Sequence, residues 1–65
     1  MSGEHLPFKV VRTNGSDEVI ARAADLRVGR AAFERAAALR PKDVIEFRNG
    51  ALVIERREPG HDAIT

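Results

Sequence analysis

Residues that could bind a metal ion or attack a substrate are few in this sequence. It contains no cysteine, which excludes a disulfide, a thiolate nucleophile and a cysteine-ligated zinc ion. His5 and His61 are its two histidines, and no Asp, Glu or second His stands at a spacing that would complete a ligand set with either. We therefore expect no metal site and interpret both histidines as solvated residues of the chain ends.

Motifs for nucleophilic catalysis and nucleotide binding are also missing. Ser2 and Ser16 are the serines, and neither lies in a nucleophile elbow. The glycines form no phosphate-binding loop, because Gly15 and Gly50 belong to turn signals and Gly29 lies inside an amphipathic segment. We therefore predict that the protein is not an enzyme, uses no cofactor and has no small-molecule substrate.

Paired carboxylates could act as general acid and general base, and Glu46 and Glu55 are the candidates for such a pair. Arg48 and Arg56 lie close to them in the sequence. Arginines beside both acids favour cross-strand ion pairs over a catalytic pair. We predict ion pairing at these positions.

Arginines that could contact phosphates cluster around the start of a predicted helix. These candidate nucleic-acid contacts are Arg22, Arg27, Arg30 and Arg35. Glu34 follows Arg30 by four residues, where it would pair with it on a helix. The formal net charge is only +1, and the sequence has no Tyr or Trp for stacking on bases. Nucleic acid is therefore not the expected partner, and weak nucleic-acid binding is kept as the alternative function.

The elements that position these residues begin with a hairpin in IEFRNGALVI, residues 45–54. The Asn-Gly pair, Asn49 and Gly50, predicts a two-residue type I′ turn, which requires positive φ at both central positions. This register pairs Phe47 with Leu52 and Ile45 with Ile54. Because side chains alternate along a strand, these four residues share one face, which we expect to be buried.

A first hairpin is predicted from FKVVRT, residues 8–13, and EVIARAA, residues 18–24, on either side of the turn signal NGSD. Two registers fit this pattern. A two-residue turn would pair Val10 with Val19, whereas a four-residue loop would pair Val11 with Ile20. The sequence does not choose between them.

A helix is predicted over residues 26–40, with Asp25 as its N-cap and Pro41 after its end. Its small Gly29 would allow a close approach to a sheet, and Phe33 supplies a large apolar plug. The full apolar face is predicted to consist of Leu26, Val28, Gly29, Ala32, Phe33, Ala36 and Leu39.

The element order predicts an α+β fold with two layers, in which a single helix packs on a four-stranded, mainly antiparallel sheet (ββαββ). The alternative is a βαββ fold with one long helix over residues 17–40, a segment that is rich in Ala and free of Pro. The β-branched Val19 and Ile20 directly after a turn, and the capping Asp25, argue against this long helix.

Length and composition fit one small domain over residues 1–65, with an ordered core over about 8–57 and flexible tails at 1–6 and 58–65. The beginning of the sequence lacks the features of a secretory signal, and no apolar run is long enough to span a membrane. We therefore expect a cytoplasmic protein without a membrane partner.

One face of the predicted sheet has no helix to cover it. The candidate interaction face on the second hairpin consists of Val44, Glu46, Arg48, Val53 and Glu55. Valines amid complementary charges suit docking on a second copy or on another protein. An edge strand is the other route to self-association, although Arg56 and Arg57 discourage uncontrolled pairing. The prediction is a protein-interaction module that forms a homodimer or binds another protein.

Four features of residues 8–58 suggest a family: a short first hairpin, an AAF helix at residues 31–33, a Pro before the third strand, and the closing IEFRNGALVIE hairpin. In these features the chain resembles small uncharacterised bacterial proteins of similar length, chiefly from alphaproteobacteria. The resemblance implies the ββαββ pattern and no known activity. It assigns no functional residues.

Overall fold

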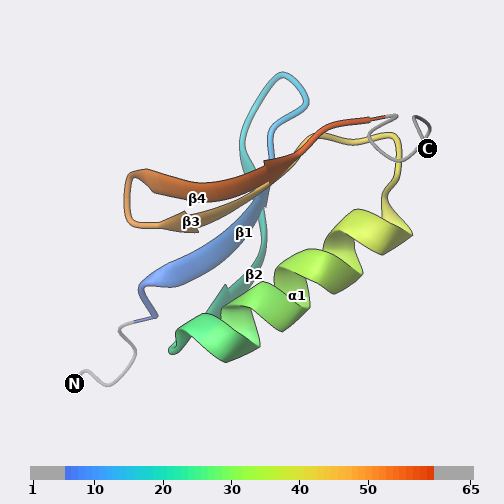
Figure 1. Cartoon of the computed structure of the whole chain (residues 1–65). Coiled ribbons are helices and arrows are strands. Elements are labelled where there is room, and N and C mark those ends of the chain that lie inside the picture. Colours follow the sequence, from blue (N-terminus) through green and yellow to red (C-terminus); the bar gives the residue numbers. More distant parts are fainter. Residues whose placement is uncertain (1–5, 60–65) are drawn as a thin grey trace.

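The computed structural model describes residues 6–59, which form a four-stranded sheet with one helix along one of its faces (Figure 1). The elements are β1 (Phe8–Arg12), β2 (Glu18–Ala23), α1 (Leu26–Leu39), β3 (Ile45–Asn49) and β4 (Leu52–Arg57). The strands lie in the order β2-β1-β3-β4, and all neighbours are antiparallel. The predicted α+β fold is confirmed. The alternative long helix is wrong, because β2 pairs with β1, and most of the predicted tails lie outside the described residues.

The local signals at both ends of α1 act as predicted. The side chain of Asp25 accepts a hydrogen bond from the backbone N–H of Val28 at 2.9 Å, which satisfies one of the free amides of the first turn. The helix ends at Leu39, and Pro41 follows two residues later.

The core lies between α1 and the middle of the sheet. Gly29 faces the sheet so closely that a Cβ atom at this position would lie 2.7 Å from the ring of Phe47. That ring also packs against the rings of Phe33 and Phe8, at centroid distances of 5.9 and 5.8 Å. The predicted role of Gly29 in close helix-sheet packing is therefore correct.

The predicted apolar face of the helix is too wide. Gly29, Phe33 and Ala36 are buried, but the side chains of Leu26, Val28 and Leu39 are 47%, 58% and 65% exposed. Val28 and Leu39 lie roughly 80–100° around the helix from Gly29. Ala37, about 80° from Gly29 on the other side, is buried. The buried sector is therefore turned away from Val28 and Leu39, which stay outside.

Both edge strands contain a β-bulge, and neither hairpin has the predicted register throughout. In the first hairpin, Val10 pairs with Ala21 and Val11 with Val19, so Ile20 is the extra residue. The four-residue-loop register holds at Val10 but fails nearer the turn, where residues 13–17 form the loop.

The second hairpin turns one residue later than predicted. Asn49 pairs with Leu52, so Gly50 and Ala51 occupy the corner. Only Gly50 has a positive φ there, at 62°, which fits a type II′ turn and not the type I′ turn that the Asn-Gly pair predicts.

The bulge at Ile54 shifts the register further, so Phe47 pairs with Glu55 and Ile45 with Arg57. Both predicted cross-strand pairs are therefore wrong. Ile45 and Phe47 are nevertheless fully buried, as expected. Ile54 packs against the core, whereas Leu52 is exposed.

The two hairpins are related by an approximate two-fold axis at the central pair Val10 and Phe47. Each residue pair between β1 and β2 has an equivalent pair between β3 and β4. The equivalent pair is found by adding 37 to the number of the β1 residue and 34 to the number of the β2 residue. Both bulges lie in a Val-Ile-x-Arg segment, at residues 19–22 and 53–56. Each extra Ile packs against the core, which explains why the bulge occurs at the same place in both hairpins.

Candidate interaction face

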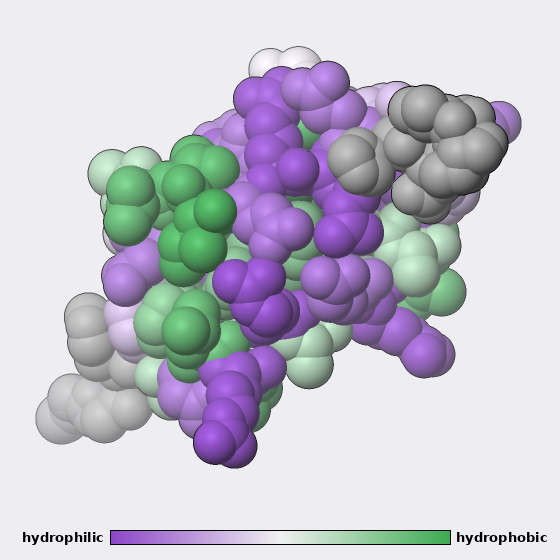
Figure 2. Space-filling model, in the orientation of Figure 1, coloured by the Kyte–Doolittle hydropathy of each residue, from purple (hydrophilic) through white to green (hydrophobic). Residues whose placement is uncertain are grey.

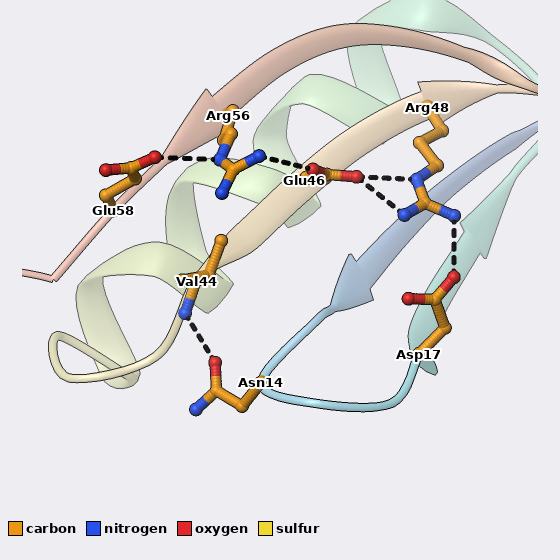
Figure 3. Close-up of polar contacts among 7 residues, drawn as sticks. All are labelled: Asn14, Asp17, Val44, Glu46, Arg48, Arg56 and Glu58. Atoms are coloured by element: carbon orange, nitrogen blue, oxygen red, sulfur yellow. Dashed lines mark hydrogen bonds and ion pairs between the residues drawn. The ribbon is translucent and has the colours of Figure 1, made fainter.

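The side of the sheet away from α1 carries the candidate site. We call this side the open face (Figure 3). The strand registers place on it Lys9, Val11, Val19, Arg22, Glu46, Arg48, Val53 and Arg56. They form successive rows across the strands, because paired residues in a sheet point to the same side. Val44 precedes β3 and is assigned to the same face by alternation with Glu46.

A chain of alternating charges crosses the open face (Figure 3). Glu46 at its centre accepts hydrogen bonds from Arg48, at 2.6–2.8 Å, and from Arg56 at 3.3 Å. Arg48 also contacts Asp17 at 3.1 Å, and Arg56 contacts Glu58 at 3.0 Å. The carboxylate of Glu46 is therefore bracketed by two guanidinium groups, and each of these reaches a second acid.

The centre of the open face is buried although the one helix of the described residues lies on the other side of the sheet. Val11 is 1% exposed and Glu46 is 6% exposed. Val11 lies on β1 between Glu46 and Val19, so the bridge from Arg48 on β3 to Asp17 beside β2 passes above it. Long charged side chains can cover apolar surface in this way while their heads stay in contact with water.

The charge of Arg48 is held firmly in this network. Its hydrogen bond to Glu46 raises the pKa of the guanidinium above its ordinary value, and the hydrogen bond to Asp17 adds to the effect against partial desolvation. Of the predicted cross-strand ion pairs, that of Glu46 with Arg56 is confirmed. The pair of Glu46 with Arg48 lies within β3, and Glu55 pairs with neither Arg48 nor Arg56.

Four of the five residues of the candidate interaction face lie where the sequence predicts. Glu55 is the exception: it pairs with Phe47 on the side of α1 and forms ion pairs with Arg30 and Arg57. The bulge at Ile54 is the physical reason, because one extra residue reverses the side to which the following side chains point.

The four arginines proposed for nucleic-acid contacts do not form one surface. Arg30 pairs with Glu55 and lies over the ring of Phe47, at 5.7 Å from its centroid. Arg22 lies on the open face, whereas Arg27 and Arg35 are exposed on the helix in the other layer. The predicted pairing of Arg30 with Glu34 is wrong, because both side chains reach to β4, where Glu34 contacts Arg57 at 3.3 Å.

Lys9 and Arg22 are the open-face cations that the sequence analysis missed as a pair. They lie directly opposite each other on β1 and β2, and neither has a carboxylate partner within residues 6–59. The four-residue-loop register, which pairs Val11 with Ile20, also sets Lys9 opposite Arg22, and the structure keeps this register from Phe8 to Val10.

A second exposed apolar area lies at the end of the molecule where β1 begins. Figure 2 shows apolar side chains gathered over the tip of the β3–β4 hairpin and over the first part of α1. Leu26 and Leu52, which belong to these segments, are 47% and 64% exposed.

Within the described part of the chain, no group of three or more His, Asp or Glu side chains gathers to hold a metal ion. Nor is any helix there long and apolar enough to cross a membrane. The chain matches no model of a protein family, no curated protein and no solved structure.

Proposed function

We propose that the protein is a non-enzymatic interaction module that binds a second copy of itself through the open face. The observation that carries this proposal is the burial of Val11 and Glu46 on a sheet face that no layer of residues 6–59 covers. Both residues are already desolvated in the single chain, and Glu46 already has its partners. A second copy that packs there therefore meets little further cost of polar desolvation at the centre.

Partly exposed valines around this centre supply the apolar surface for docking. Val19 and Val53 are 40% and 43% exposed, and Val44 is half-buried. Covering such side chains gains about 25 cal/mol for each Å² of apolar surface removed from water. Face-to-face packing of two sheets is the arrangement that covers all three at once.

Pairing through an edge strand is the less favourable route to self-association. A bulge interrupts each edge strand, at Ile20 in β2 and at Ile54 in β4. Bulges twist an edge and break the regular row of free backbone groups that a new strand would need. The open face is therefore the better candidate.

The size of the face sets the expected affinity. Four strands about 4.8 Å apart and five residues long, at about 3.3 Å per residue, present roughly 300 Å² of projected area per copy. Stable complexes bury roughly 800 Å² of accessible surface per partner, so a flat footprint of this size corresponds to a small interface. We expect a weak, reversible dimer with a dissociation constant on the order of 100 µM.

Sedimentation velocity tests this proposal over protein concentrations from about 10 µM to about 1 mM. The weight-average sedimentation coefficient should rise with concentration for the natural chain. Val19→Asp should abolish the rise, because it places a carboxylate in the interface. Val28→Asp is the matched control: its side chain is 58% exposed in the other layer, so association should persist. A natural chain that stays monomeric over the whole range contradicts the proposal.

A further inference from the structure

When the two hairpins are compared by the approximate symmetry of the sheet, one position on the open face has a cation where its equivalent has an acid. Glu46 and Arg56 form a cross-strand ion pair in the second hairpin. The equivalent positions in the first hairpin are Lys9 and Arg22, which also lie directly opposite each other. Like charges in this arrangement repel, and no carboxylate of residues 6–59 pairs with either. Half of the open face is therefore neutralised internally, and the other half has an uncompensated positive charge.

An acid suited to compensate this charge lies on the same half of the open face. The side chain of Asp17 is 59% exposed, and its ion pair with Arg48 at 3.1 Å leaves the outer side of the carboxylate accessible. Asp17 precedes β2 by one residue, and Arg22 lies near the other end of that strand. They are too far apart along one chain to pair, at five residues and about 3.3 Å per residue.

A two-fold axis can bring this acid and this cation together from different copies. The midpoint between residues 17 and 22 falls between residues 19 and 20. Val19 is the residue there that points to the open face, because it pairs with Val11, and it is 40% exposed. Consider a two-fold axis that lies between the two packed sheets, runs perpendicular to the strands and passes over Val19. It places residue 17 of one copy over residue 22 of the other, and it brings the two Val19 side chains together.

We propose that two copies dock face to face about this axis, with Asp17 of each copy paired with Arg22 of the other and Val19 of both copies at the centre. This arrangement rests on the self-association proposed above and specifies its geometry. It also brings the partner's carboxylate next to Lys9. The proposed axis sets the row of Val19, Val11, Glu46 and Arg56 against itself, and the two charges of this row already neutralise each other within each copy. An axis parallel to the strands is less favourable, because it would set the uncompensated Lys9 and Arg22 row of one copy against the same row of the other.

Charge exchange tests the pairing. Asp17→Arg and Arg22→Asp should each raise the dimer dissociation constant at least tenfold, since each creates two like-charge contacts in a symmetric dimer. An equimolar mixture of the two variants should associate again, because both contacts in the mixed dimer then join opposite charges. Arg35→Asp, on the exposed surface of α1, is the matched control and should leave association unchanged. Association of either single variant as in the natural chain, or no association of the mixture, overturns the arrangement.

A crosslinking experiment that changes no charge guards against variants that fail to fold. The chain has no cysteine, so Val19→Cys introduces a unique thiol. A bismaleimide with a reach of about 10 Å, the spacing of packed sheets, should join two Val19→Cys chains efficiently. Val53→Cys, one row away from the axis, should crosslink at least tenfold more slowly. Equal crosslinking of the two variants overturns the arrangement even if the natural chain dimerises, whereas a monomeric natural chain overturns the proposed function itself.

Discussion

The substitution Gly29→Ala tests how closely α1 lies against the sheet. A Cβ atom at this position would lie 2.7 and 2.9 Å from two ring carbons of Phe47 and 3.2 Å from Cβ of Phe8. The ring of Phe47 is fully buried, with Phe33 stacked against it and the guanidinium of Arg30 over it. It therefore cannot move aside without disturbing several neighbours.

Two opposing effects determine the stability of the Gly29→Ala variant. Alanine in place of glycine inside a helix stabilises by about 1 kcal/mol. Forcing a methyl group into a filled core costs about 1–3 kcal/mol. Since the contacts of Gly29 are with the middle of a rigid ring, we expect the overpacking to dominate. The free energy of unfolding should fall by about 1 kcal/mol, and Tm should fall by about 5 °C.

Urea denaturation followed by circular dichroism measures this change. Ala31→Gly, at an exposed position of the same helix, is the control for helix propensity and should cost about 1 kcal/mol. In a Phe47→Leu background, where the ring is gone, Gly29→Ala should become neutral or stabilising. If Gly29→Ala stabilises the natural chain by about 1 kcal/mol, the close approach of helix and sheet is refuted.

Two further predictions concern the polar contacts. Glu46→Gln should lower the free energy of unfolding by about 1–3 kcal/mol in urea titrations, because it removes the charge of a buried acid between two arginines. Glu34→Gln should change it by less than about 0.5 kcal/mol, because the Glu34 side chain is 51% exposed, and equal losses in the two variants would contradict the role of Glu46. Asp25→Ala should cost about 1 kcal/mol and increase amide exchange in the first turn of α1, whereas Asp25→Ser should restore most of the stability; no difference between the two would exclude the cap.

The sequence predicts those parts of the fold that depend on local chemistry. Asp25 caps α1 because its carboxylate reaches an amide three residues away, and this requires no knowledge of the sheet. The burial of Ile45 and Phe47 follows from their alternation with polar neighbours. Gly29 is predicted to face the sheet because it is the residue of that helix face with no side chain.

Strand registers are not predictable in the same way, because each depends on a bulge. Ile20 and Ile54 gain burial against the core when one extra residue is inserted, and this gain depends on the helix that packs there. The bulge at Ile54 in turn moves Glu55 to the side of α1. The similar segments VIAR and VIER are the signal that could have indicated equivalent bulges in the two hairpins.

The most direct test of the open face as the working surface is the concentration dependence of backbone amide chemical shifts. As the protein is concentrated from about 10 µM to about 1 mM, the shifts of Val11, Val19 and Arg22 should change together along one binding curve. Those of Val28 and Arg35, in the other layer, should stay constant. Changes confined to α1 or to the apolar end around Leu52, or no changes at all, would contradict the account.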